Sequence, residues 1–295
     1  MTPPRGGGRG RRPGTRFPHQ GITARDRRQA HIDWLRLIEV SGPFLSVPVL
    51  TQEWPDLDSL DSRARDRLRQ EHRQWQEKPA ENAARWISFV TGELLGWAGE
   101  VRRDGVAGLA LDVPEHDTTL VPSFTLVEPG TGDIRLLGLV TDGSPVARIQ
   151  GSDWPATPAD RLAQLCRHHG VELGLATDGR WWALVWAPAG GVTTVAVFDA
   201  IAWPDTSERD LVRAFLSLLE RHRFLAVPPE RQLPALLRES LKNQEETTDR
   251  LGVQVRQAVE LLVAAFGRAD AAARQRGQAG LAGSPRTRPT GARSR

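Results

Sequence analysis

The feature that most constrains the fold is a central block of strand-like sequence between two helical regions. Apolar and β-branched residues fill 119–127 and 134–140, and the Pro-Gly-Thr-Gly-Asp run at 129–133 separates them. Short β-rich runs joined by turn residues are typical of a hairpin. An Asp178-Gly179 pair predicts a type I′ turn between two later strands. These later strands are predicted over 171–176, 180–187 and 192–198.

One helix is predicted inside this block. Thr157 and Asp160 form a capping box, and Pro158 occupies the first helical position. This helix is expected to end at Gly170, and its apolar face includes Cys166. The pattern predicts that Cys166 belongs to the core and is not a nucleophile.

Helical periodicity flanks the block on both sides. A first helix is predicted from a capping box at Thr23 to the Ser41-Gly42-Pro43 stop, and its apolar positions include Ile38. Ser207 is expected to cap a later helix, followed by an αα arm of two helices over about 230–273. Two more helices are predicted over about 58–76 and 80–97. The apolar stripe of the arm consists of Leu251, Val255, Ala258, Leu262 and Phe266.

Arginine is concentrated at the two ends of the chain. Residues 1–25 and 271–295 each contain six arginines and no acid, so a net charge of +3 for the whole chain leaves −9 for residues 26–270. An acidic body argues against a broad positive surface for duplex DNA. We expect disordered tails over 1–22 and 274–295, with or without a binding role. Their candidate nucleic-acid contacts are Arg5, Arg9, Arg11, Arg12, Arg274 and Arg276.

Cysteine content and hydropathy indicate the compartment. Cys166 is the one cysteine, so an internal disulfide is excluded and a reducing environment is expected. No apolar run approaches the length of a membrane span, and the N-terminus lacks the apolar segment of a signal peptide. The sequence predicts a cytoplasmic protein without a membrane partner.

The predicted order of elements matches the core of PD-(D/E)XK nucleases, in which two acids and a lysine hold Mg²⁺ against the scissile phosphate. The sequence has Ser123 where the first acid is needed and Gly138-Leu139-Val140 where Glu-x-Lys is needed. We therefore predict a mixed α/β (α+β) fold with a degenerate nuclease core and no metal site. Ser123, Gly138 and Val140 are its degenerate positions. Three nearby acids leave a divergent Mg²⁺-dependent endonuclease as an alternative: Glu115, Asp117 and Glu128.

Methyl transfer chemistry is not predicted for this chain. DNA adenine methylation needs an Asn/Asp-Pro-Pro-aromatic loop that holds the flipped base. Neither Asn82 nor Asn243 precedes a proline, and Asp-Pro-Pro does not occur. The glycine-rich run at 6–10 follows no predicted strand, so it is not a cofactor fingerprint.

Aromatic and histidine residues of the central block have two interpretations. Trp181, Trp182 and Trp186 are expected to bury a central strand, with stacking on nucleobases as the alternative. His168 and His169 are adjacent and lack a His-x-x-x-His partner, so we predict no metal site there.

Two parts of the chain carry a resemblance. One is the capped helix TPADRLAQLCR at 157–167 with GVELGLATDGRWWALV at 170–185; the other is LPALLRES at 233–240 with the helical run at 244–269. Together they resemble the N-terminal region of large adenine-specific DNA methyltransferases of restriction–modification and phage-defence systems such as DISARM and BREX. The resemblance covers about residues 26–273. It implies a nuclease-like domain and a helical arm that lead into a methyltransferase domain with S-adenosylmethionine.

The resemblance also implies a division of the chain and a function. We expect a nuclease-like domain over 23–204 and a helical arm over 205–273. In fully nucleolytic relatives this region is the endonuclease, whereas defence methylases often lack its acids, and Ser123 and Gly138 agree with the second group. The expected function is therefore that of a non-catalytic N-terminal module that contributes assembly or DNA contacts.

The expected partners follow from this function. They are DNA and a separate methyltransferase or defence-system subunit, because the catalytic half, and with it S-adenosylmethionine, is expected in a missing or separately encoded part of a truncated or split gene. No cofactor is expected in this chain. A free-standing DNA-binding protein that uses its arginine-rich tails is the other alternative.

Overall fold

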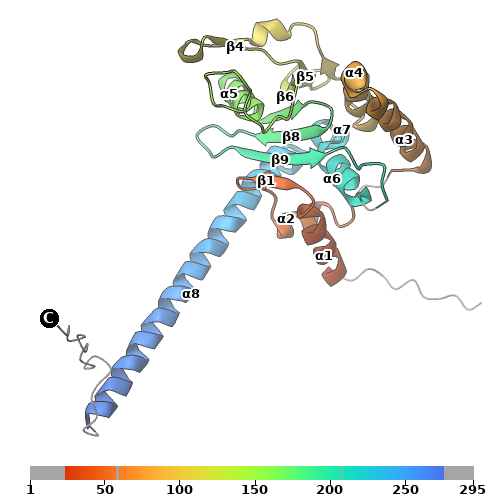
Figure 1. Ribbon diagram of the computed structural model, residues 1–295. Helices are drawn as coiled ribbons and strands as arrows, with labels where there is room; N and C mark the ends of the chain where they lie inside the picture. Colours follow the sequence, from red (N-terminus) through yellow and green to blue (C-terminus); the bar gives the residue numbers. More distant parts are fainter. Residues whose placement is uncertain (1–23, 58–59, 207, 276–295) are drawn as a thin grey trace, which may run out of the picture.

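A seven-stranded mixed sheet forms the centre of the molecule, in the order β1-β9-β8-β7-β6-β5-β2 (Figure 1). The computed structural model describes residues 24–57, 60–206 and 208–275. The strands are β1 (Glu39–Ser41), β2 (Val101–Arg102), β5 (Phe124–Val127), β6 (Ile134–Val140), β7 (Leu173–Thr177), β8 (Trp181–Trp186) and β9 (Thr194–Asp199). β6 and β7 are parallel, and the other neighbouring strands are antiparallel. A separate hairpin contains β3 (Leu111–Val113) and β4 (Thr118–Leu120).

Helices cover both faces of this sheet. The α-helices are α1 (Ala24–Leu35), α2 (Val47–Glu53), α3 (Ser62–Glu77), α4 (Pro79–Phe89), α5 (Pro158–His169), α6 (Arg209–Leu219), α7 (Arg221–Leu225) and α8 (Leu233–Gln275). The shorter helical segments are η1 (Val90–Leu94), η2 (Val106–Leu109), η3 (Pro114–His116) and η4 (Pro229–Arg231). In the described part of the chain, no helix has both the length and the apolar character needed to cross a membrane.

The sheet separates two hydrophobic cores. The larger core lies between the sheet and α1–α4, α6, α7 and the start of α8, and the smaller core lies between the sheet and α5 with the β3–β4 hairpin. Neighbouring residues of β6 face opposite sides, because Leu136 belongs to the larger core and Leu137 to the smaller. β7 is buried along its whole length, and apart from Thr177 it consists of apolar residues and glycine, as expected of a strand that is buried on both faces.

Two local predictions are confirmed. Strand β6 has the predicted bounds and pairs with β5 as a hairpin. The N-terminus of α5 has the predicted capping box: the Asp160 amide donates to Thr157 Oγ1 at 3.1 Å, and the Thr157 amide donates to Asp160 Oδ2 at 2.9 Å. Gly170 ends this helix with a φ of +66°.

The prediction of one strand over 119–127 is wrong. β4 ends at Leu120 and pairs with β3, whereas β5 begins at Phe124 and belongs to the main sheet. Pro122 lies in the break, and proline has no amide proton to donate to a strand ladder. The segment therefore divides between two sheets.

The predicted type I′ turn is also wrong. That turn needs a positive φ at both central residues, and of Asp178 and Gly179 only Gly179 has one, at +94°. The last β7–β8 pair is Thr177 with Trp182, so the connection is longer than two residues. Asp178 Oδ1 instead accepts from the amides of Arg180 at 2.9 Å and Trp181 at 2.7 Å. This side chain, rather than a mirror-image turn, stabilises the connection.

Both ends of the described chain differ from the helical predictions. α1 ends at Leu35, so Ile38 lies outside it, and β1 pairs with β9 where a helix end was expected. The expected αα arm is one helix, α8, because no break occurs between Leu233 and Gln275. Residues 1–22 lie outside the described residues, as do Thr23 and Ser207 of the two predicted caps.

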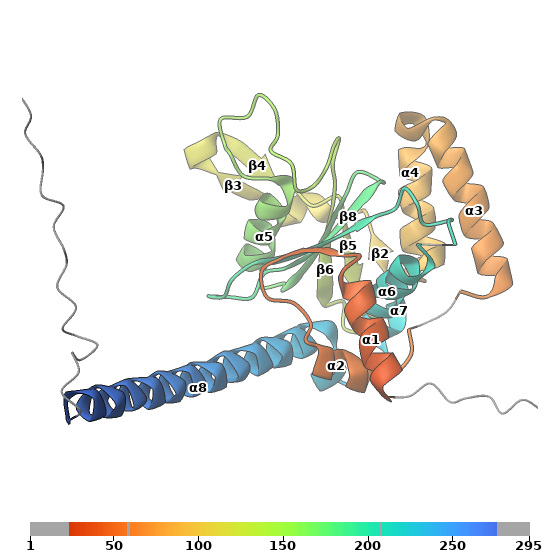
Figure 2. The same ribbon diagram turned by 60° about the horizontal axis from the view of Figure 1, so that its bottom comes forward.

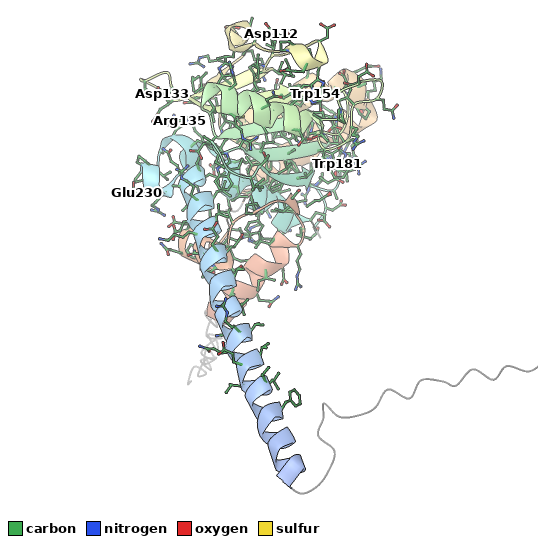
Figure 3. The ribbon with its side chains drawn as sticks, turned by 90° about the vertical axis from the view of Figure 1, so that its left-hand side faces the viewer. Asp112, Asp133, Arg135, Trp154, Trp181 and Glu230 are labelled. Atoms are coloured by element: carbon green, nitrogen blue, oxygen red, sulfur yellow. The ribbon has the colours of Figure 1, made fainter. Side chains whose placement is uncertain are left out.

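The helices after residue 205 are divided between the body and a projection. α6, α7 and the first two turns of α8 contribute to the larger core. Beyond Gln244, which bonds the Phe44 carbonyl, α8 extends away from the sheet and its helices (Figures 1, 2 and 3).

Candidate functional site at the end of strand β6

A hollow of about 580 Å³ lies beyond the carboxyl end of β6, and we call it the β6 hollow. Its walls are β4, the 141–150 segment and the inner face of α5. Leu120, Leu139 and Leu162 line its apolar part. β6 and β7 are parallel. In α/β sheets, ligands bind in the crevice beyond the carboxyl ends of parallel strands, because the segments that follow the strands diverge there.

Apolar side chains continue to the rim of this hollow. Val121, Val140 and Ile149 line it and are about 40% exposed. A concave apolar surface with a few polar groups is typical of a small-molecule or nucleotide site.

The charged residues of the hollow are Arg148, Arg161 and Asp142. Arg148 and Asp142 are exposed. Two guanidinium groups against one carboxylate make the hollow locally positive, although the sequence between the tails is acidic overall. The hollow therefore favours an anionic group such as phosphate.

An ordered aromatic wall positions Arg161. Its guanidinium lies 4.5 Å from the centroid of the Trp154 ring, and the other stacking partner of Trp154 is His116, at 4.6 Å and an interplanar angle of 10°. Arg161 Nη2 also donates to Ser152 Oγ at 2.8 Å and to the Trp154 carbonyl at 3.3 Å. Figure 3 shows Trp154 beside α5. This stack holds one positive charge in a defined place next to the hollow.

Two of the degenerate nuclease positions meet beside the hollow. The Ser123 amide donates to the Gly138 carbonyl at 2.7 Å, and Ser123 Oγ accepts from the Val140 amide at 2.9 Å. The Ser123 hydroxyl thus extends the β5–β6 ladder by one bond. The order of the predicted strands assigned Ser123 and Val140 to one degenerate site, and the two residues are in direct contact in the structure.

Gly138 faces the larger core instead of the hollow. A Cβ built there would lie 2.2 Å from Cζ of Phe124, and the Phe124 side chain is buried. Position 138 therefore has no space for any side chain, a carboxylate included. Its neighbour Leu139 points to the opposite face and lines the hollow.

The three acids of the endonuclease alternative do not converge. Glu128 lies in the turn between β5 and β6, at the far end of the hairpin, and is paired with Arg135. Glu115 and Asp117 lie at η3 and the start of β4, and both are exposed. In the part of the chain that the structure describes, no three His, Cys, Asp or Glu side chains gather as metal ligands.

The other singled-out residues are structural. Trp182 and Trp186 are buried in the larger core, whereas Trp181 packs on the smaller core and lies beneath Arg180 at 4.5 Å. The interpretation as core residues is confirmed for Trp182 and Trp186, whereas Trp181 is half-buried. Cys166 is fully buried, and burial raises the pKa of its thiol to about 12, so it is a core thiol at neutral pH. His169 Nε2 bonds the Leu109 carbonyl at 2.9 Å.

The arginines of the tails lie outside what the structure describes. Arg274 falls in the last turn of α8, but its side chain is not described, and the other five candidate contacts (Arg5, Arg9, Arg11, Arg12 and Arg276) lie in undescribed segments. The residues that sequence reasoning missed are Arg148, Arg161 and Trp154. The one local signal in the sequence was that Arg161 lies one turn after the helix cap Thr157 and shortly after the loop residue Trp154.

No protein-family model, curated protein or solved structure matches this chain significantly. The function is therefore inferred from the residues of the β6 hollow and from the order of the strands around it. Both are properties of the body, and neither depends on the tails.

Proposed function

We propose that this chain is a nuclease-like module without nuclease chemistry, which holds one DNA nucleotide in the β6 hollow. In this proposal it works beside a separate adenine DNA methyltransferase that binds S-adenosylmethionine. The observation that carries the proposal is the position of a locally positive, apolar hollow at the carboxyl end of the parallel strands β6 and β7.

The topology supports the nuclease-like part. β2, β5 and β6 form an antiparallel series, and α5 then crosses to β7, which is parallel to β6. This is the strand and helix order that the PD-(D/E)XK resemblance implies for residues 101–177. The same order gives the hollow its walls, since α5 packs over β6 and β7.

The chemistry of the hollow supports binding over cleavage. Hydrolysis with a divalent cation needs several carboxylate oxygens at one point. Among the described residues, Asp142 is the one acid that lines the hollow, Ser123 uses its hydroxyl within the strand ladder, and position 138 is closed by Phe124. An apolar pocket next to two arginines suits a base and its phosphate.

The hollow has the size and charge for a single nucleotide and not for a long duplex. Ligand sites have volumes of roughly 300 to 1,000 Å³, and the hollow lies within that range at about 580 Å³. The net charge of −9 over residues 26–270 opposes contact along an extended phosphate backbone. We therefore expect a preference for single-stranded or unstacked DNA.

The test is fluorescence anisotropy with labelled single-stranded and duplex oligonucleotides. Arg148→Ala should weaken binding of the single strand and lower its salt dependence by about one counterion. Arg103→Ala is the matched control, because Arg103 is exposed and lies outside the hollow. Equal affinities for the two variants would contradict the proposal.

Two further measurements separate the alternatives. If deletion of residues 1–22 and 276–295 abolishes binding while Arg148→Ala has no effect, the tails bind DNA and the hollow does not. Mg²⁺-dependent plasmid cleavage that is lost on alanine substitution of Glu115, Asp117 or Glu128 would establish the endonuclease alternative. The methyltransferase partner is tested by co-purification with a neighbouring methyltransferase subunit and by restoration of adenine methylation.

A further inference from the structure

The projecting part of α8 exposes an apolar stripe in its outer half. Leu251, Val255, Val259, Leu262 and Phe266 repeat at spacings of three or four residues and therefore lie on one side of the helix. Each of these side chains is between 52% and 61% exposed. An apolar helix face of this length is normally covered in a folded protein.

The stripe continues the face by which α8 is anchored in the body. Leu237 is buried in the larger core, Leu241 packs against that core, and Gln244 Nε2 donates to the Phe44 carbonyl at 3.0 Å. Leu237, Leu241, Gln244 and Leu251 are separated by three, four or seven residues, so they lie on the same side of the helix. The body therefore covers this face at its start and leaves it uncovered further out.

The undescribed tails do not have the composition to cover the stripe. Residues 276–295 contain one large apolar residue, Leu281, among arginine, glycine and proline. Residues 1–23 contain three, Met1, Phe17 and Ile22. A segment without a repeating apolar pattern cannot match a helical stripe, so neither of these two segments is suited to cover it.

We propose that the cover is α8 of a second copy, paired antiparallel. The stripe is symmetric about the midpoint between Ala258 and Val259: Leu251 and Phe266 are equally distant from it, as are Val255 and Leu262. A two-fold symmetric interface needs a surface that is complementary to itself, in which each residue pair occurs twice. Antiparallel pairing about this midpoint provides such a self-complementary surface, because Leu251 of each copy then lies opposite Phe266 of the other.

The charges of α8 favour the antiparallel direction. Residues 239–249 contain four acids and one lysine, whereas residues 250–274 contain four arginines and two acids. Antiparallel copies place the acidic half of one helix against the basic half of the other, and parallel copies place like charges together. In the proposed register, Asp249 of each copy lies level with Arg268 of the other.

The length of α8 also fits this register. Gln275 of one copy lies level with Lys242 of the other, which is where the buried face of α8 ends. The two α/β bodies then lie at opposite ends of the helix pair. This inference does not depend on the proposed DNA contact, because the β6 hollow lies on the body.

The first experiment measures the mass of the full chain by light scattering during size-exclusion chromatography. The wild type should have twice the monomer mass of 32.5 kDa. The double substitution Val255→Glu/Leu262→Glu should give the monomer. The control Gln257→Glu, at an exposed position on the opposite side of the helix, should leave the dimer. All ten tryptophans lie between residues 34 and 203, so tryptophan fluorescence checks that the body stays folded.

The second experiment measures direction by oxidative cross-linking. Leu251→Cys/Phe266→Cys should form disulfide-linked dimers in high yield, whereas Leu251→Cys alone should form few. Efficient linking of the single variant would show parallel helices and would overturn the proposal. A wild-type monomer, or a dimer that survives Val255→Glu/Leu262→Glu, would overturn it as well.

Discussion

The two faces of the sheet are closed in different ways. On the larger-core face, helices pack against the strands, and Trp86, Trp182 and their neighbours fill the space. On the other face, α5 covers β6 and β7 along their length, but the chain between β6 and α5 leaves the β6 hollow beyond the strand ends. From this difference we infer that the larger-core face contributes most of the stability and that the face with the β6 hollow binds the ligand.

On the larger-core face, which we call the closed face, hydrogen bonds from tryptophan side chains hold the packed segments together. Indole groups are large and apolar but carry one donor, which usually has a hydrogen-bond partner when buried. Trp86 Nε1 donates to the Gly179 carbonyl at 2.7 Å, Trp54 Nε1 to that of Ser217 at 2.8 Å and Trp97 Nε1 to that of Leu219 at 2.9 Å. These bonds join segments that are distant in sequence. The face is therefore held by specific contacts as well as by burial.

The largest expected effect is on the closed face. Trp86→Ala removes a buried ring that stacks on Trp75 at 5.4 Å and should lower the free energy of unfolding by about 3–5 kcal/mol. Trp154→Ala, at the hollow, should cost clearly less because Trp154 is only half-buried. Urea unfolding followed by circular dichroism measures both. Equal losses would remove the distinction between the faces.

A second prediction concerns the contact of Gly138 with Phe124. Gly138→Ala would place a methyl group within the Phe124 ring and should destabilise the chain by about 1–3 kcal/mol. Gly143→Ala is the control, since a Cβ there meets nothing within 4 Å. Phe124→Leu in the Gly138→Ala background should recover part of the loss. A Gly138→Ala variant as stable as Gly143→Ala would show that this position is open to a side chain.

A smaller effect is expected from His72, which is buried on the closed face with Nε2 2.8 Å from the Ala200 carbonyl. Burial lowers the pKa of His72 below 6.5, so the unfolded chain takes up its proton first as the pH falls. The stability due to the neutral ring is present above pH 6.5 and is lost as the pH falls through the lowered pKa. His72→Gln should flatten this acid-side decline. His168→Gln, at an exposed position, should leave the decline as in the wild type.

The elements that the sequence predicted correctly are those with local signals. The α5 capping box involves residues three apart, and β6 is one apolar run between turn residues. β1 and β2 contain three and two residues, and their pairing with β9 and β5 depends on distant parts of the chain. No local pattern marks such strands.

The candidate site was predicted only in part for the same reason. Strand order placed Ser123 and Val140 beside each other, and the structure agrees. The hollow itself depends on the path of residues 141–150 and on the β3–β4 hairpin, which folds over α5. These are tertiary arrangements, so Arg148 had no distinguishing mark in the sequence, and Arg161 had only its position one turn after the cap of α5.

The most direct test of the central claim is to map where DNA touches the chain. A single-stranded oligonucleotide that contains 5-iododeoxyuridine is cross-linked to the protein by ultraviolet light, and the attached peptides are identified by mass spectrometry. We predict cross-links within residues 114–161, at or next to Trp154 and His116, and a loss of these cross-links in Arg148→Ala. Cross-links confined to residues 1–25 and 276–295 would contradict the assignment of DNA contact to the β6 hollow.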